Sequence, residues 1–341
     1  MPIKACCLTR GSSVTSHAEA RFTSGSLRLH QVFALFVLLA TTLTVAAADD
    51  PGARLDAMSR AFRTLDYHGV FTYEQGQTLS SHRIVHAVAG GIERERIVHL
   101  DGNAREFRRG RHASDCEHAG DRLLRLDPAR RLARETAVTP HAGGIGAYYA
   151  IEFDGSERVA NRTGLRLHIA PRDPYRYGMV MVLDDASSLL LKSETTDGAG
   201  RVLERFQFVE LEIGNAMPAS EFGADGDEET HPEPVADAVP VFGWTVSWLP
   251  QGFVQSGGGA RRPAEGVDPV EIRTYTDGLA VFSIFVERAS ALQAGAGVAS
   301  RGATVSFVVP RGHGHLVTVV GEIPVGTAQL IATAVNFPDE D

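Results

Sequence analysis

Apolar residues recur every three or four positions shortly after residue 50. They form one stripe along a helix, made by Leu55, Met58, Phe62 and Leu65. Asp50 is a suitable N-cap, and Pro51 is favoured at a first helical position because its ring already fixes φ near the helical value. The pattern predicts a helix of about 15 residues that buries one face.

From Tyr67 the apolar period changes to two, which places Tyr67, Gly69, Phe71 and Tyr73 on one face of a strand. Further strand-like segments follow, separated by turn signals of which Asp197–Gly200 is a good hairpin turn. These segments are residues 80–88, 91–100, 103–110, 158–173, 175–185, 189–196 and 202–211. A helix followed by many meandering strands predicts a curved antiparallel sheet with helices packed on it. Its apolar concave face must be filled by helices, side chains or a ligand.

Residues 214–241 have a different composition, with seven acidic residues, four prolines and neither Lys nor Arg. Like charges and prolines favour an extended linker. We therefore expect one domain at 49–213, a flexible acidic linker at 214–241 and a second domain at 242–338.

The second domain has alternating segments at 270–278, 279–289, 303–312 and 315–323. After Pro324, Leu330, Ile331, Ala334 and Val335 fit a helical stripe. The sequence thus predicts an α+β protein in which the second α+β domain is smaller than the first.

Residues 1–48 are typical of an export signal. A short apolar run ends in Ala46-x-Ala48, a small-x-small cleavage site before Asp49. The alternative is an uncleaved membrane anchor, although the run is short for a span of ~20 residues. The stretch before the apolar run is long for an export signal, so translation from an internal start remains an alternative.

The net charge is −9, and beyond residue 48 it is −12, from 29 Lys and Arg against 41 Asp and Glu. An acidic body argues against a general nucleic-acid-binding protein. Beyond the signal segment Cys116 is the single cysteine, so an internal disulfide is excluded there.

Thirteen histidines prompt a search for metal or acid–base sites. His82 and His86 share a strand face, and His313 and His315 lie beside glycines, but no carboxylate or cysteine cluster with zinc-ligand spacing accompanies them. We interpret them as exposed strand and loop histidines. No nucleophile elbow, metalloprotease helix or phosphate-binding loop is present, so we expect neither an enzyme, nor a cofactor, nor a metal.

Arginines cluster at two places, and arginine suits bidentate recognition of carboxylates and phosphates. The first cluster includes Arg105, Arg108 and Arg109, and the second is Arg261 and Arg262 beside the glycine-rich stretch Gly257–Gly259. We interpret that stretch as a permissive loop. A solvated face paired with the chain's own acids is the alternative for both clusters.

The two tryptophans, Trp244 and Trp248, lie four positions apart and are followed by a Leu-Pro-Gln-Gly turn and Phe253. Positions four apart on a strand face the same way. They are either the core of the second domain or an exposed edge that docks a partner, since aromatics dominate both.

This Trp-rich stretch, the "RRP" at 261–263, "YTDGLAVFSIFVERA" and "VVGEIPVGTAQLIATAVNF" resemble the RseB/MucB family in order and spacing. The stretch at 55–73, which begins in the predicted helix, and the stretch "RDPYRYGMVMVLDD" resemble the same family more loosely. Residues 110–126 depart from it, which puts any ligand contact there in doubt.

The resemblance implies a periplasmic, non-enzymatic negative regulator of an envelope-stress sigma factor. Such a protein binds the periplasmic domain of a membrane anti-sigma factor and shields it from site-one proteolysis. Lipopolysaccharide or the acyl chains of a mislocalised lipoprotein, held in a first domain similar to the carriers LolA and LolB, release the complex. The alternative is a periplasmic lipid or lipoprotein carrier that resembles LolA.

On this interpretation Trp244, Trp248, Phe253, Arg261 and Arg262 are the candidate partner-binding residues. The candidate lipid-binding residues are Phe71, Tyr73, Arg105, Arg108 and Arg109. The sequence does not identify the natural lipid, and a homo-oligomer is compatible with it.

Overall fold

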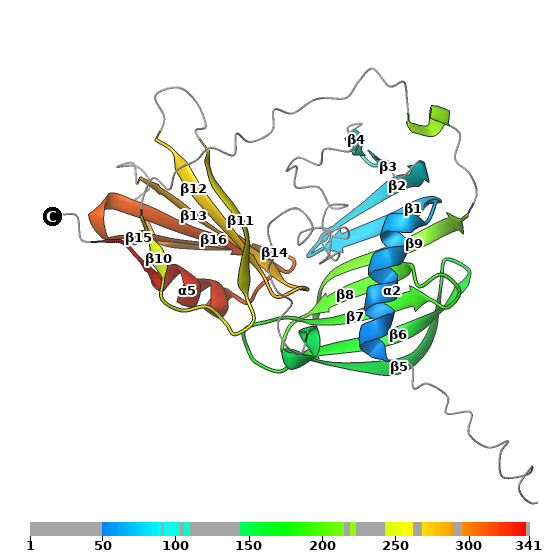
Figure 1. Cartoon of the computed structure of the whole chain (residues 1–341), viewed down its shortest axis with the longest axis horizontal. Coiled ribbons are helices and arrows are strands. Elements are labelled where there is room, and N and C mark those ends of the chain that lie inside the picture. Colours follow the sequence, from blue (N-terminus) through cyan, green and yellow to red (C-terminus); the bar gives the residue numbers. More distant parts are fainter. Residues whose placement is uncertain are drawn as a thin grey trace, which may run out of the picture. The chain divides into compact units, whose positions relative to one another are not determined.

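The computed structural model describes residues 50–89, 92–102, 106–109, 144–214, 219–222, 243–261, 268–288 and 295–338. Within these residues the chain forms two large antiparallel sheets, a two-stranded ribbon and two α-helices (Figure 1). The predicted α+β class is confirmed, although strands predominate. None of the helices in the described ranges is long and apolar enough to cross a membrane.

The first sheet has nine strands in the order β4-β3-β2-β1-β9-β8-β7-β6-β5. They are β1 (Tyr67–Gln75), β2 (Thr78–Ala89), β3 (Ile92–His99), β4 (Glu106–Arg109), β5 (Tyr149–Val159), β6 (Arg162–Pro171), β7 (Gly178–Asp184), β8 (Leu190–Thr196) and β9 (Val202–Ile213). A short 3-10 helix, η1 (Ile145–Ala147), precedes β5, and η2 (Ala219–Phe222) follows β9.

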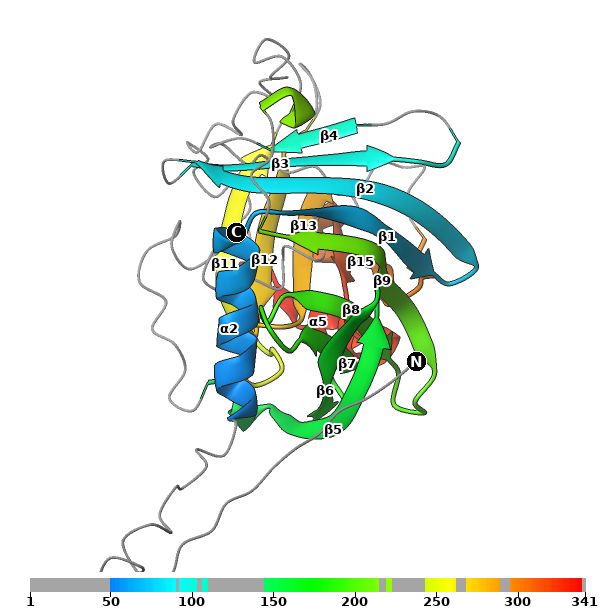
Figure 2. The same cartoon turned by 90° about the vertical axis from the view of Figure 1, so that its right-hand side faces the viewer.

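Helix α2 (Pro51–Thr64) begins as predicted, with the Asp50 carboxylate accepting the Gly52 N–H at 3.0 Å. Its buried residues include Leu55, Met58 and Phe62. The helix contacts both β2 and β5, which lie on opposite sides of the strand order. The sheet must therefore curve strongly. Figure 2 shows α2 extending from the side of the sheet that holds β2 to the side that holds β5.

The period-two pattern of β1 is confirmed, because Tyr67, Gly69, Phe71 and Tyr73 are all buried while their neighbours are part-exposed. Gly69 is needed here. A Cβ at this position would lie 2.2 Å from the backbone oxygen of Glu210 on β9, next to a bulge in the β1–β9 pairing.

The second sheet has the order β11-β12-β13-β16-β15-β14, with α5 (Val325–Thr333) packed on β15 and β16 (Figure 1). Its strands are β11 (Val254–Arg261), β12 (Val270–Thr276), β13 (Val281–Arg288), β14 (Gly297–Arg301), β15 (Thr304–Arg311) and β16 (His315–Gly321). The 3-10 helix η3 (Gly312–Gly314) joins the last two, and β10 (Thr245–Val246) pairs with β17 (Val335–Asn336).

Three local predictions are wrong. Residues 158–173 are not one strand, because Ala160 and Asn161 adopt positive φ and form the turn between β5 and β6. Gly257–Gly259 are not a loop but lie in β11, paired with β12. The stripe in α5 is also different: Leu330 is 46% exposed, whereas Thr327, Ala328, Ile331 and Ala332 are buried. Val335 is buried, but in β17 rather than in the helix.

The hairpin turn at Asp197–Gly200 is confirmed, since Gly200 N–H donates to Asp197 O and Asp197 N–H to Arg201 O. Most of the acidic stretch at 214–241 lies outside the described residues, so its role as a flexible linker stays a prediction. Within it, η2 is described, and Arg96 Nη1 donates to Glu221 O at 3.0 Å.

Candidate partner-binding site

The two sheets meet at a buried ion pair between Arg176, in the β6–β7 loop, and Asp277, in the β12–β13 turn. Arg176 Nε donates to Asp277 Oδ2 at 2.6 Å, and both side chains are fully buried. Tyr149 on β5 donates its hydroxyl to the same oxygen at 2.9 Å. One carboxylate oxygen of the second sheet is thus held by two donors of the first.

The second oxygen of Asp277 builds the turn on which the residue lies. Asp277 Oδ1 accepts the backbone N–H groups of Leu279 at 2.9 Å and Ala280 at 2.8 Å. The turn points Leu279 into the apolar core of the first sheet, where this side chain is buried. Positive φ at Gly278 explains the glycine at the tip.

Arg176 is enclosed by aromatic rings. Its Cζ lies 5.0 Å from the centroid of the Tyr148 ring and 4.9 Å from that of Phe253, distances at which a cation is attracted to a π face. Arg176 also donates to Gln251 O and pairs with Asp173. Burial raises the pKa of Tyr149 well above its ordinary value and the Asp277 charge raises it further, so the phenol stays a donor.

A second contact joins the sheets at Glu204 on β9. The carboxylate accepts the Tyr73 hydroxyl at 2.7 Å and, at 2.9 Å, the backbone N–H of Ala303 at the β14–β15 turn. A Cβ on Gly302 would lie 2.6 Å from the Glu204 side chain, so the close approach requires glycine.

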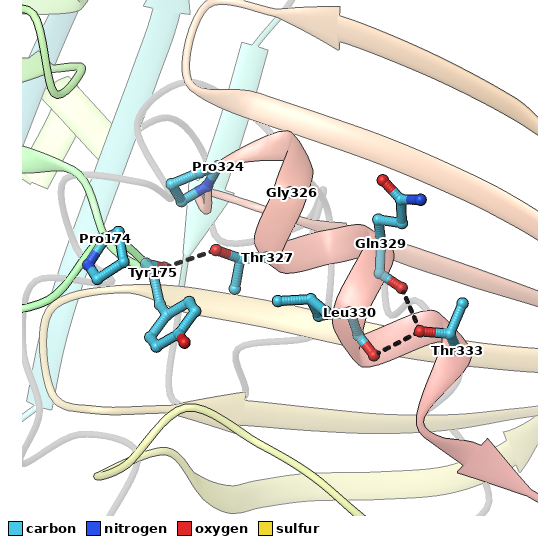
Figure 3. A pocket seen from close by; sticks show the side chains of 8 residues that line it. All are labelled: Pro174, Tyr175, Pro324, Gly326, Thr327, Gln329, Leu330 and Thr333. Carbon is cyan, nitrogen blue, oxygen red and sulfur yellow. Dashed lines mark hydrogen bonds between the residues drawn. The ribbon is translucent and has the colours of Figure 1, made fainter.

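Beside the ion pair, an open groove of about 470 Å³ lies between the β6–β7 loop and α5 (Figure 3). It is lined by Pro174, Tyr175, Pro324, Gly326, Thr327, Gln329, Leu330 and Thr333. The Thr327 hydroxyl donates to Tyr175 O at 3.2 Å, which ties the two walls together. The Tyr175 ring meets Trp248 edge to face, with 5.2 Å between ring centroids.

The groove offers apolar surface and little charge. Leu330 is 46% exposed, and none of the eight lining residues is Asp, Glu, Lys, Arg or His. A groove of this kind suits an apolar segment whose backbone polar groups form their hydrogen bonds elsewhere. Within the described ranges, no group of three or more His, Cys, Asp or Glu side chains could hold a metal ion.

The structure separates the aromatic residues suggested as partner-binding. Trp244 is 1% exposed in the core of the second sheet, with Arg273 Cζ 3.7 Å from the ring centroid. Phe253 is also buried there, against Phe282 and Arg176. Trp248 is part-exposed and touches the groove wall through Tyr175. Of the three, it alone lies where a bound segment could touch it without rearrangement.

The arginines are described only in part. Arg261 ends β11, and Arg108 and Arg109 lie on β4, but their side chains are outside the described residues, as are Arg105 and Arg262 altogether. Phe71 and Tyr73 are buried in the first sheet, where Phe71 packs on Phe206 and Phe208. Their roles in binding stay predictions.

The interpretation of the histidines as exposed is wrong for three of them. His82, His86 and His315 are buried, because each ring stacks on an aromatic side chain: Phe71, Tyr67 and Phe337 respectively. His86 Nδ1 lies 2.8 Å from Leu65 O, and Nε2 lies 3.1 Å from Glu93. These histidines are satisfied core residues. His313 is outside the residues whose side chains are described.

The sequence patterns did not indicate four of the candidate site residues: Arg176, Asp277, Tyr175 and Leu330. The turn signal "TDG" at 276–278 was visible in the sequence, and so were the arginines of "RDPYRYG". No local pattern shows that the β6–β7 loop and the β12–β13 turn, whose residues Arg176 and Asp277 are 101 positions apart, meet and exclude water.

Two antiparallel sheets joined by a buried ion pair beside an apolar groove give this protein a candidate binding surface to which both sheets contribute. Residues 50–225 match the family model for the MucB/RseB N-terminal domain, and residues 239–336 match that for the MucB/RseB C-terminal domain. The chain belongs to the MucB/RseB family.

Relatives by sequence include the sigma factor AlgU regulatory protein MucB of Pseudomonas aeruginosa. It is 34% identical over 314 residues, which are 89% of this chain and 96% of that protein. The sigma-E factor regulatory protein RseB of Escherichia coli K12 is 29% identical over 307 residues, 86% of this chain and 92% of RseB.

Solved structures agree. A crystal structure of MucB in complex with MucA(peri) matches with a TM-score of 0.68 at 32% identity, covering 84% of this chain and 99% of that one. A crystal structure of MucB matches with a TM-score of 0.61 at 31% identity, covering 86% and 99%. The resemblance noted from the sequence is therefore confirmed over both sheets.

Proposed function

We propose that this protein is a periplasmic negative regulator of the envelope stress response. It binds the periplasmic part of a membrane anti-sigma factor, shields that part from site-one proteolysis, and releases it when lipopolysaccharide or a mislocalised lipoprotein binds. The supporting observation is that MucB, similar to this chain over both sheets, was crystallised in complex with MucA(peri).

We place an apolar part of the anti-sigma segment in the groove between Tyr175 and α5. The groove is open, almost uncharged and already formed, and Leu330 projects from α5 at its edge, 46% exposed among the described residues. Trp248 supports the wall through Tyr175. Aromatic and leucine side chains around a preformed apolar groove are a common way to hold a peptide segment.

Leu330→Gln tests this placement, with Val325→Gln as its matched control. Val325 lies on the same helix and is 40% exposed, but it does not line the groove. Covering the exposed half of a leucine is worth about 1 kcal/mol, or about fivefold in Kd. Calorimetric titration with the periplasmic segment of the anti-sigma factor should show at least that loss for Leu330→Gln and none for Val325→Gln.

Equal affinity of both variants would remove the groove from the interface. No binding by the unaltered protein would instead contradict the proposed function itself. The two results are distinct because the second does not depend on any substitution.

Shielding and release are tested with the same complex. Digestion of the anti-sigma segment by a site-one protease should slow when this protein is added, and lipopolysaccharide should restore the rate. A ligand can release the complex only if it binds the free protein more tightly than the bound one. Lipopolysaccharide that binds without lowering partner affinity would therefore contradict the release step.

The lipid is proposed to enter the curved first sheet, as in carriers of the LolA and LolB kind. Phe71 and Tyr73 line its apolar face but are buried. An acyl chain that reaches them must displace side chains now packed there, including Phe206 and Phe208. We propose further that the protein is exported and cleaved near Ala48, which mass spectrometry of the periplasmic form would test.

A further inference from the structure

The groove has two walls that come from different sheets. Pro174 and Tyr175 belong to the β6–β7 loop, whereas the remaining lining residues belong to α5 and its entry (Figure 3). Its width therefore depends on how firmly that loop is held against the second sheet. One hydrogen bond, from Thr327 to Tyr175 O, joins the walls directly.

Arg176 follows Tyr175 and makes the stronger connection. Its guanidinium donates to Asp277 in the β12–β13 turn and to Gln251 O in the loop that carries Trp248, and it pairs with Asp173 two residues before Tyr175. The same side chain thus fixes the groove wall to two separate segments of the second sheet. An exposed ion pair would hold little, but this one is shielded from water on all sides.

We infer that Arg176 and Asp277 are positioning residues for the partner-binding groove: they hold its two walls in register without touching the partner. The inference rests on the proposed function for the identity of the partner. Both side chains are fully buried, so a bound segment would not reach them, and their effect on affinity must pass through the Pro174–Tyr175 wall.

Asp277→Asn is the sharpest test because it keeps the turn. The amide oxygen can still accept the N–H groups of Leu279 and Ala280, as Oδ1 does now. The amide nitrogen then faces the donors of Arg176 and Tyr149, which leaves a buried guanidinium without its acceptor.

Asp184→Asn is the matched control. Asp184 is also a buried turn residue that accepts a backbone N–H, from Ser187, and binds an arginine, Arg162, through both oxygens. These partners lie in the first sheet and its β7–β8 turn, so the substitution removes a partly buried ion pair without loosening the groove.

Two measurements decide the matter. The first is the distance between spin labels at Val209 on β9 and Val298 on β14, both 58% exposed, in a chain whose native cysteines are replaced by serine. The second is the Kd for the periplasmic anti-sigma segment. Asp277→Asn should broaden the distance distribution and weaken binding at least tenfold, whereas Asp184→Asn should do neither.

An unchanged distance distribution in Asp277→Asn overturns the inference, and so does a broadened one with unchanged affinity. If the unaltered protein does not bind the segment, the proposed function fails, while the label distances still show whether the ion pair fixes the sheets. Tyr149→Phe serves where Asp277→Asn does not fold. It removes one of the two donors to Asp277 Oδ2 and should give the same changes at a smaller size, about threefold in Kd.

Discussion

Replacing Trp244 by alanine should greatly lower the free energy of unfolding of the second sheet, whereas the same change at Trp248 should lower it little. Trp244 is 1% exposed and packs in the core with Phe253, Phe282 and Val335. Trp248 lies at the margin of that core and is part-exposed.

The magnitude follows from burial. Truncation of a buried Trp to Ala costs about 3–5 kcal/mol in transfer and cavity terms. Loss of the Arg273 contact at 3.7 Å from the ring adds about 1 kcal/mol. The indole Nε1 is buried and has no hydrogen-bond partner in the described structure, so its removal returns about 1–3 kcal/mol. The net loss is about 3 kcal/mol, against a total of about 5–15 kcal/mol for a typical domain.

Urea unfolding followed by circular dichroism measures the loss. Because the chain has two tryptophans, the one left in each variant also reports by fluorescence on the second sheet. Trp248→Ala should cost about 1 kcal/mol, in line with its partial burial, yet weaken partner binding. Trp244→Phe should cost less than Trp244→Ala, since it keeps most of the ring volume and removes the unpaired N–H.

A loss below 1 kcal/mol for Trp244→Ala would refute the assignment of this residue to the core. So would a larger loss at Trp248 than at Trp244. Either result would return the Trp-rich stretch to the interpretation in which both rings dock a partner.

Three other predictions concern the rest of the molecule. Burial would raise the pKa of Asp184, but the hydrogen bonds from Arg162 and Ser187 outweigh burial and lower the pKa below its ordinary value. The stability that the Asp184 carboxylate contributes is therefore present above about pH 4 and is lost as the pH falls through the lowered pKa. Acid titration of Asp184→Asn should lack that part of the stability loss. Gly69→Ala should destabilise by at least ~2 kcal/mol because the new Cβ meets a backbone oxygen at 2.2 Å, whereas Gly259→Ala, with no atom within 4 Å, should be close to neutral by thermal unfolding. Arg261→Ala with Arg262→Ala should leave the melting temperature nearly unchanged but weaken binding of the anti-sigma segment about tenfold, and unchanged affinity would remove both arginines from the interface.

The sequence by itself determined the local elements whose periodicity is strong. The stripe from Leu55 to Phe62, the Asp50 cap and the alternation along β1 all predict what the structure shows, because burial of one face leaves a fixed period in the sequence. The family was also readable from the sequence, through the order and spacing of its C-terminal stretches.

Strands without that signal were missed. The β11 strand carries three consecutive glycines, and glycine has no side chain whose alternation could mark a buried face; its strand conformation comes from pairing with β12. The prediction that Leu330 is buried is wrong for a related reason. A leucine in an apolar stripe is ordinarily buried, and only the position of the β6–β7 loop beside α5 leaves Leu330 at an open groove.

The candidate site depended on tertiary structure most of all. Arg176 and Asp277 are an ordinary arginine and an ordinary turn aspartate in the sequence, and they are separated by 101 residues. Their burial as a pair is a property of two loops meeting, which no local pattern records. The histidines show the same limit, since His86 is polar by sequence but buried because the fold supplies Leu65 O, Glu93 and the Tyr67 ring around it. Local periodicity decides which elements form, whereas contacts between distant segments decide which polar groups lose water and thereby become the site.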